Sequence, residues 1–263
     1  TWDINSGLDG SKFSIDGSGN LTFNSAPNFE VPQDSDGNNT YQVEVKATTT
    51  DGSGIFSTQV LTVTVNNVNE SSPTIDTTSL TGSIQENANT NTVIYDVSAS
   101  DADITDILTY SVSGTDASLV AIDSDDGEVR LKSSANFETK NSYSFNVIAT
   151  DPDGSSDTEA VTVNVTNVNE MPSITSSATV TAAENQANSS VLYTATATDV
   201  DSGDNLTFSI SGVDSSYFTI DADDGEVRLK ASADYETKSS YDFTVLATDD
   251  GLGTLSGSKV VVL

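Results

Sequence analysis

Asn167-Val-Asn-Glu-Met-Pro172 and its near-twin Asn67-Val-Asn-Glu-Ser-Ser-Pro73 decide how this chain is organised. Each segment follows an alternating, strand-like run, residues 161–165 or 61–65, and leads into a further β-rich stretch. Their side chains and free carbonyls place several oxygen atoms just before a proline. Ca²⁺ takes roughly six to eight such oxygens from carboxylates, amides and backbone carbonyls. The two segments are therefore predicted to be linkers between β-domains, where both neighbours and the linker supply ligands to a cation.

The composition is strongly acidic. Of 263 residues, 40 are Asp or Glu and 9 are Lys or Arg, so the formal net charge is −31. Such a chain repels phosphate groups, and neither nucleic acid nor an anionic membrane surface is expected as a partner. No apolar run approaches the roughly 18 residues of a membrane-spanning helix, so no membrane insertion is expected. Scattered surface acids also serve solubility, and only those at the repeat junctions point to a bound ion.

The residues of the common catalytic sites are missing or badly placed. The sequence has no cysteine and no histidine, which removes disulfides, the usual general base and the commonest zinc ligand. Two acid pairs, Asp125–Asp126 and Asp223–Asp224, each precede a glycine. That pattern is typical of a hairpin turn and not of an acid–base pair in a cleft. The chain is therefore not expected to be an enzyme.

A repeat with an offset of 98 residues is the strongest signal in the sequence. The segment Ile122-Asp-Ser-Asp-Asp-Gly-Glu-Val-Arg-Leu-Lys132 recurs, with one substitution, as residues 220–230. The same offset relates Glu86 to Glu184 and Asp151 to Asp249. One repeat per roughly 100 residues is the size of an immunoglobulin-like sandwich.

The repeat predicts three domains. These are residues 1–70, a partial repeat with the later strands only; residues 71–170, a complete repeat; and residues 171–263, a third repeat. Trp2 is in register with Tyr110 and Phe208, so it is predicted to be a core strand residue and the first repeat to be truncated at its N-terminus. A fragment boundary and a donor-strand partner both explain the truncation.

Short alternating runs, such as Phe13–Ile15, Leu21–Phe23 and Tyr143–Val147, are separated by turns rich in Asp, Gly, Asn and Ser. Helical periodicity is essentially absent. The predicted fold is all-β, a series of tandem immunoglobulin-like Greek-key β-sandwiches.

At its junctions the sequence resembles the cadherin repeat family, in the form found in large bacterial surface adhesins. The family pattern has five elements: an early Glu, Asp-x-Asp, Asp-x-Glu, Ala-x-Asp and a linker Asp-x-Asn-Asp. The first four elements occur in order in the second and third repeats, and the linker element follows the first and second repeats. Asn replaces an aspartate of the pattern at Asn28, Asn136, Asn67 and Asn167. Amide oxygens still coordinate Ca²⁺, but each replacement removes a charge and is expected to weaken binding.

The resemblance implies a ligand set for each junction, with up to about three ions. For the first junction the set is Asn28, Glu30, Asn67, Val68, Asn69, Glu70, Asp101, Asp103 and Asp151. For the second it is Glu86, Asn136, Glu138, Asn167, Val168, Asn169, Glu170, Asp199, Asp201, Asn205 and Asp249. The first junction lacks the early Glu and is expected to hold fewer ions. Glu184, Asp234 and Glu236 would serve a third junction.

The function implied by the resemblance is mechanical. Ca²⁺ at the junctions would stiffen a rod-like stalk of an extracellular adhesin or filament, at the cell surface or secreted. Its partners would be calcium ions, neighbouring repeats of the same chain and a cell-surface or self partner. An adhesive module that binds another copy or a glycan directly is the alternative, which a row of exposed aromatic side chains or a missing-strand groove would favour.

Overall fold

The chain is built from short β-strands. The structure, a computed structural model, describes residues 1–263 and contains three single 3-10 turns in addition to the strands. The strands are β1 Trp2–Ser6, β2 Phe13–Ile15, β3 Leu21–Phe23, β4 Thr40–Thr48, β5 Phe56–Thr64, β6 Thr74–Ile75, β7 Thr81–Gln85, β8 Val93–Asp96, β9 Ala99–Ser100, β10 Thr109–Ser113, β11 Val120–Ile122, β12 Glu128–Leu131, β13 Ser142–Thr150, β14 Ser156–Thr166, β15 Ser173–Ile174, β16 Tyr193–Thr194, β17 Ala197–Thr198, β18 Thr207–Ser211, β19 Phe218–Ile220, β20 Glu226–Leu229, β21 Asp242–Thr248 and β22 Ser256–Val262. The 3-10 turns are η1 Gly10–Lys12, η2 Ala117–Leu119 and η3 Ser215–Tyr217. The all-β prediction is confirmed.

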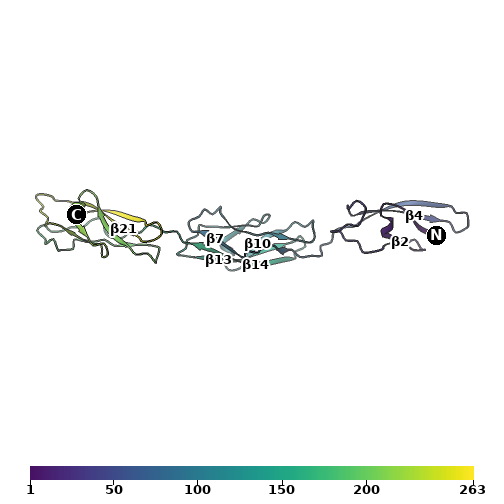
Figure 1. Ribbon diagram of the computed structural model, residues 1–263, viewed down its shortest axis with the longest axis horizontal. Helices are drawn as coiled ribbons and strands as arrows, with labels where there is room; N and C mark the ends of the chain where they lie inside the picture. Colours follow the sequence, from purple (N-terminus) through teal and green to yellow (C-terminus); the bar gives the residue numbers. More distant parts are fainter. The chain divides into compact units, whose positions relative to one another are not determined.

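The middle of the chain contains two main sheets. One has the strand order β10-β13-β14-β7, and the other has the order β11-β12-β8 (Figure 1). Strands β6 and β9 form a small additional ladder. Some paired strands, such as β13 and β14, are consecutive in the sequence, and others, such as β14 and β7, are far apart in it. This mixture is typical of a sandwich with Greek-key connections.

The last hundred residues repeat this arrangement. Strands β18-β21-β22 form one sheet, β16-β20-β19 the other, and β15-β17 the small ladder. Position 179 pairs with Val262 only through an isolated bridge, where the preceding repeat has the full strand β7. The core of this repeat centres on Phe218, Phe243 and Val245, and the two phenyl rings lie 4.5 Å apart between centroids.

The first residues form a smaller assembly. The sheet β1-β4-β5 and the hairpin β2-β3 enclose a core of Phe13, Tyr41, Val43 and Val45. The prediction for Trp2 is only half right. Trp2 lies in β1, opposite Ala47, but its side chain is 40% exposed. Its ring lies over Gly19, where an added Cβ would come within 2.8 Å of the indole, so the ring covers a turn and does not enter the core.

Alternation of apolar and polar residues explains which side chains are buried. In β13 every second residue, from Tyr143 through Phe145 and Val147 to Ala149, is buried. Successive side chains of a strand point to opposite faces, so one face of β13 lines the core. The backbone ladder continues beyond the apolar run, and β13 and β14 are therefore longer than the patterned segments alone indicate.

The chain forms two compact units. One comprises residues 1–82, 91–132 and 144–162, and the other comprises residues 83–90, 133–143 and 163–263. The first predicted junction lies wholly within the first unit, and the second junction lies wholly within the second unit. The geometry of each junction is therefore described within its own unit.

A glycine at the end of the Asp-Asp-Gly turn fits closely against a neighbouring strand. Gly225 has φ +68°, and a Cβ on it would lie 2.5 Å from the carbonyl oxygen of Ala195. Gly253 also has a positive φ, +98°, but a Cβ there would meet nothing within 4 Å. A side chain at either position would be strained by the positive φ, but only a side chain at position 225 would also overlap a neighbouring atom.

Replacing Gly225 by alanine is expected to lower the free energy of unfolding by about 2–4 kcal/mol, because left-handed strain and overpacking add. Gly253→Ala carries only the strain and should cost about 1–2 kcal/mol. Urea unfolding of the two variants beside the parent chain measures the difference. Equal losses would show that the overlap with Ala195 is relieved without cost.

Candidate metal centres

Two aspartates at equivalent positions anchor the linkers. Asp103 is 2% exposed, and its Oδ2 accepts hydrogen bonds from the backbone N–H groups of Glu70 (3.1 Å) and Ser71 (2.8 Å). Asp201 is 6% exposed, and its Oδ2 accepts from the N–H of Glu170 at 2.8 Å. Each linker is thus held against the second Asp of the Asp-x-Asp motif that follows it.

The first Asp of each motif shapes the turn. Asp101 Oδ1 accepts from the N–H of Asp103 at 3.0 Å, and Asp199 Oδ1 accepts from the N–H of Asp201 at 3.1 Å. Such side-chain bonds to the backbone two residues on are typical of Asx turns. They leave Oδ2 of Asp101 and of Asp199 buried and without a partner.

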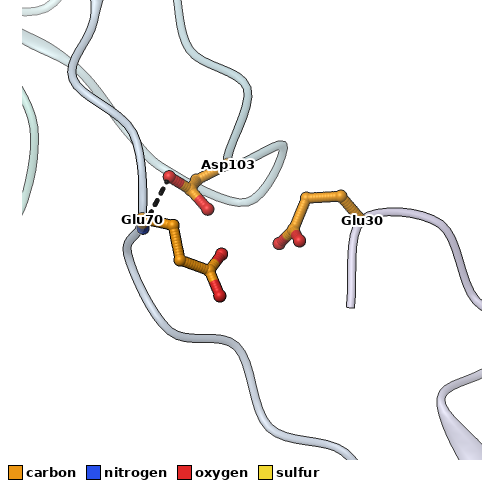
Figure 2. A group of neighbouring side chains, drawn as sticks. All are labelled: Glu30, Glu70 and Asp103. Carbon is orange, nitrogen blue, oxygen red and sulfur yellow. Dashed lines mark hydrogen bonds between the residues drawn. The ribbon is translucent and has the colours of Figure 1, made fainter. Parts of the chain in front are cut away.

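Three carboxylates meet at the first junction. Glu30, Glu70 and Asp103 each offer one oxygen, and these atoms lie within 4.8 Å of one another. Figure 2 shows the three carboxyl groups pointing into one shared space, with the hydrogen bond from Glu70 N–H to Asp103 beside it. Burial, followed by the charges of Glu30 and Asp103, raises the pKa of Glu70. Repulsion among these groups is what a cation in this space would remove.

Glu86 joins three segments at the second junction. It is 2% exposed; its Oε2 accepts from the N–H of Phe137 at 2.9 Å, and its Oε1 accepts from the N–H of Val168 at 2.8 Å. The end of β7, the loop after residue 135 and the linker therefore meet at one carboxylate. The early Glu of the family pattern therefore holds the linker in place.

Further acids gather around Glu86. Glu86, Glu138 and Glu170 bring carboxylate oxygens within 4.8 Å of one another. Burial and then the charges of Glu86 and Asp201 raise the pKa of Glu170, and burial is also the largest cause of the raised pKa of Glu138. Asp201 is different, because the N–H of Glu170 donates to it and lowers its pKa.

A second group at the first junction includes an acid that the motif did not select. Asp101, Asp106 and Asp151 bring carboxylate oxygens within 4.8 Å of one another. The repeat offset of 98 residues relates Asp106 to Asp204. Comparing the repeats with each other therefore identifies this acid from the sequence alone. Neither residue belongs to the five-element pattern. The structure thus adds a residue to each junction that motif matching missed.

Buried oxygen atoms without hydrogen-bond partners test whether these groups suit Ca²⁺. Buried acceptors normally have partners, and oxygens of this kind are the ligands that Ca²⁺ takes. At the junctions the unpartnered ones are Glu30 Oε1, Asn67 Oδ1, Asp101 Oδ2, Asp106 Oδ2, Asp151 Oδ2, Glu170 Oε2, Asp199 Oδ2 and Asp204 Oδ2. The residues present therefore fit the ion that the resemblance implies.

The linker amides lie against the acids. Asn167 donates from Nδ2 to Asp201 Oδ1 at 2.7 Å, and Asn169 donates from Nδ2 to Asp249 Oδ1 at 3.1 Å. Asn67 donates to Thr105 Oγ1 at 3.0 Å. The predicted linker residues are thus close to the predicted acids of the following repeat.

Other predicted asparagines are engaged elsewhere. Asn28 Oδ1 accepts from the N–H of Val31 at 2.8 Å, and Asn136 Oδ1 accepts from the N–H of Thr139 at 2.7 Å. Asn205 donates from its N–H and its Nδ2 to Asp250, at 2.7 and 2.9 Å. Asn28 and Asn136 thus close local turns, whereas Asn205 joins two loops through Asp250.

The acids predicted for a third junction also form a group. Glu184, Asp234 and Glu236 bring carboxylate oxygens within 4.8 Å of one another, and all three residues are exposed. Glu184 Oε2 accepts from the N–H of Tyr235 at 3.3 Å. The group repeats the arrangement of Glu86 and Glu138.

Comparison with known proteins identifies the repeats. The model of the cadherin domain matches residues 80–166 and 178–263. Human protocadherin-1 is 33% identical over 135 residues, which cover 48% of this chain and 13% of that protein. Human protocadherin Fat 4 is 33% identical over 150 residues, 54% of this chain and 3% of that protein. The chain therefore spans only a small part of these curated relatives.

Solved structures of cadherin repeats share the fold. Mouse cadherin-23 EC22-24 has a TM-score of 0.60 and 22% identity, covering 100% of this chain and 84% of that one. Human cadherin-23 EC21-23 has a TM-score of 0.61 and 23% identity, covering 99% and 87%. At this identity the likeness concerns the fold alone, and it supports the predicted tandem β-sandwiches.

The relatives found are vertebrate proteins, so the expected bacterial source gains no support from them. No helix in the structure is long and apolar enough to cross a membrane. Cadherin domains are non-enzymatic, extracellular or cell-surface adhesion modules, and they bind Ca²⁺ at inter-domain junctions. Since the domain model matches more than half of its residues, the chain belongs to the cadherin family.

Proposed function

We propose that this chain is a segment of an extracellular stalk in which Ca²⁺ at both junctions stiffens the joints between repeats. The carrying observation is the set of buried, unpartnered carboxylate oxygens beside each linker. At the first junction they come from the preceding repeat and the following repeat, with an amide oxygen of the linker residue Asn67 beside them. At the second junction they come from the linker and the following repeat, and Glu86 and Glu138 of the preceding repeat are grouped with the linker residue Glu170. An ion bound by all three segments restricts their relative motion.

Each junction has a group on either side. At the first, Glu30 and Glu70 face Asp103, and Asp101 and Asp151 form the neighbouring group. At the second, Glu86, Glu138 and Glu170 form one group, while Asp199, Asp201 and Asp249 lie on the side of the third repeat. Carbonyl oxygens of Val68 and Val168 and amide oxygens of the linker asparagines would complete the coordination.

The physical effect follows from the charges. Two unit charges about 4 Å apart repel by ~4 kcal/mol at an effective dielectric constant near 20. Without a cation, the like-charged groups oppose a compact junction. Burial is the largest cause of the raised pKa of Glu70, Glu138 and Glu170, and the charges of neighbouring carboxylates add to it. When bound, Ca²⁺ supplies the positive charge that makes the ordered arrangement favourable.

The chain's own hydrogen bonds set the geometry in which this happens. Glu86, in the repeat before the linker, accepts a hydrogen bond from the N–H of Val168. Asp201, in the repeat after the linker, accepts one from the N–H of Glu170. A ligand that binds only the ordered arrangement stabilises it by ~2.7 kcal/mol when its free concentration is a hundredfold above the dissociation constant. Extracellular modules commonly bind Ca²⁺ at roughly 10⁻⁴ to 10⁻³ M, so ordinary extracellular calcium suffices.

Small-angle scattering tests the proposal. At fixed ionic strength, roughly 5–10 mM Ca²⁺ is expected to lengthen the maximum dimension and narrow the distribution of sizes, and excess chelator should reverse both changes. Asp201→Ala removes an acceptor of the linker and should weaken the response. Asp223→Ala, an exposed acid of a hairpin turn in the same repeat, is the matched control.

Identical scattering profiles with and without Ca²⁺ would contradict the proposal. A response that survives Asp201→Ala unchanged would show that the second junction takes no part in it. Direct contact with another copy or a glycan, and a bacterial adhesin as the parent protein, stay predictions.

A further inference from the structure

We propose that Asp106 and its counterpart Asp204 are additional Ca²⁺ ligands, which place one more carboxylate in each junction than the family pattern contains. This inference rests on the proposed function, because it concerns the same ions. It adds a residue outside the five motif elements. That residue increases the negative charge at junctions whose linkers carry Asn67 and Asn167 where the pattern has aspartate.

The position of Asp106 is fixed by its backbone. Its N–H donates to the carbonyl oxygen of Asp103 at 2.9 Å, which closes a turn directly after the Asp-x-Asp motif. This turn brings the Asp106 carboxylate within 4.8 Å of those of Asp101 and Asp151. The three acids come from two loops, so they meet only in the folded repeat.

Each of the three acids Asp101, Asp106 and Asp151 has a buried oxygen without a hydrogen-bond partner, which indicates a bound ligand. Asp151 is 4% exposed, and its Oδ2 has no hydrogen-bond partner, although its Oδ1 accepts from the N–H of Ser155 at 2.8 Å. Oδ2 of Asp101 and Oδ2 of Asp106 are also buried and unpartnered. A buried acceptor without a partner is costly unless an ion or a water molecule satisfies it.

The buried aspartates that serve the fold alone behave differently. Asp9 is 2% exposed, and its two oxygens accept from the N–H groups of Ser35 and Gln42 at 2.6 and 2.8 Å. Asp214, in the third repeat, accepts from the N–H of Asp242 at 2.8 Å and from Lys238 Nζ at 3.1 Å. These carboxylates have ordinary protein partners, whereas one oxygen of Asp106 has none.

The second junction repeats the turn and the unpartnered oxygen. The N–H of Asp204 donates to the carbonyl oxygen of Asp201 at 3.1 Å, and Asp204 Oδ2 is buried without a partner. Gly251 leaves the space that this carboxylate needs. A Cβ at Gly251 would lie 2.3 Å from Asp204 Oδ2 and 2.0 Å from Asn169 Oδ1, so these two oxygens converge beside the glycine.

The charges around both residues agree with this assignment. Asp106 shares its group with the carboxylates of Asp101 and Asp151, and the turn at Asp204 is closed on the carbonyl oxygen of Asp201. A carboxylate surrounded by like charges gains more than an isolated one from a bound divalent cation.

The first junction offers a local probe of this ion. Tyr110 lines the same pocket as Asp101, Asp103 and Asp106, and its hydroxyl accepts from the N–H of Ala99 at 3.2 Å. The repeat offset places Phe208 at this position in the third repeat. Emission of bound Tb³⁺ that is lost in Tyr110→Phe therefore reports the ion beside Asp106.

The experiment titrates the whole chain with Tb³⁺ and then displaces the bound Tb³⁺ with Ca²⁺. Ca²⁺ should displace the Tyr110-dependent emission of the parent chain, and Asp106→Asn should raise the Tb³⁺ concentration needed for half-maximal emission by about tenfold, because ligand charge sets affinity. Asp106→Glu should recover part of this loss. Asp96→Asn, with the same charge change at an exposed position of β8, should shift the midpoint by less than about twofold.

The outcomes separate the two proposals. An unchanged midpoint in Asp106→Asn, with normal displacement in the parent chain, would overturn the role of Asp106 and leave the calcium junction intact. Absence of any Ca²⁺-displaceable emission in the parent chain would overturn the proposed function itself. If Asp106→Asn lowered the melting temperature as much in chelator as in Ca²⁺, Asp106 would have a purely structural role, and the assignment would also be overturned.

Discussion

Glu86→Ala is expected to remove most of the calcium-dependent stability of the second junction. The substitution deletes the acceptor for the N–H groups of Phe137 and Val168, and hydrogen bonds to charged groups contribute about 1.5–3 kcal/mol each. With Ca²⁺ the expected loss in free energy of unfolding is about 3–6 kcal/mol, the sum over the two hydrogen bonds. In chelator the loss should be smaller, because removing one charge also relieves repulsion with Glu138 and Glu170.

Denaturant unfolding with Ca²⁺ and with chelator measures both values. Glu184→Ala is the matched control, because Glu184 occupies the same position in the next repeat but is exposed and accepts a single hydrogen bond, from the N–H of Tyr235. It should change the free energy of unfolding little in either condition. If Glu86→Ala cost the same with and without Ca²⁺, Glu86 would be a structural acceptor and not an ion ligand.

Phe243→Ala is expected to have the largest effect on stability in the third repeat. Phe243 is 1% exposed, and its ring packs on Phe218 at 4.5 Å and on Tyr193 at 6.1 Å between centroids. Truncating a buried phenylalanine costs about 3–5 kcal/mol, because transfer free energy and the cavity add. Val260→Ala, in the neighbouring strand but 58% exposed, should cost far less.

Two spectroscopic signals separate the expected effect from general unfolding. Trp2 is the single tryptophan, and it lies in strand β1 of the first repeat with its ring over Gly19, so its fluorescence reports the unfolding of that repeat. Phe243→Ala should move the unfolding transition seen by circular dichroism and leave the tryptophan transition in place. Equal movement of both transitions would show that the repeats unfold as one cooperative unit.

Alternation predicted the strands where apolar residues mark one face. The hairpin Phe13–Ile15 and Leu21–Phe23 has the predicted bounds, because its apolar residues coincide with its ladder. Strand β4 extends three residues beyond its apolar run to Thr48. The ladders β6-β9 and β15-β17 consist of short strands without an apolar pattern, so periodicity contains no signal for them.

The candidate sites were predictable to the extent that they follow the repeat. Glu30, Glu70 and Asp103 are brought together as the motif implies, although about 70 residues of sequence separate the first from the last. Asp106 and Asp204 lie outside the five-element family pattern, so the resemblance did not select them. The repeat offset of 98 residues nevertheless relates one to the other. The turn-closing roles of Asn28 and Asn136 depend on local backbone geometry, which residue spacing alone does not specify.

The hydrogen bonds of the second linker also limit how such a chain can change in length. Val168 is tied to Glu86 and Glu170 to Asp201, so a single residue, Asn169, lies between the two attachments. An inserted residue there has no slack in which to bulge without breaking one attachment. Insertions are better tolerated in loops without two such attachments. A chain of this kind therefore becomes longer by gaining complete repeats, each with a linker of the same length.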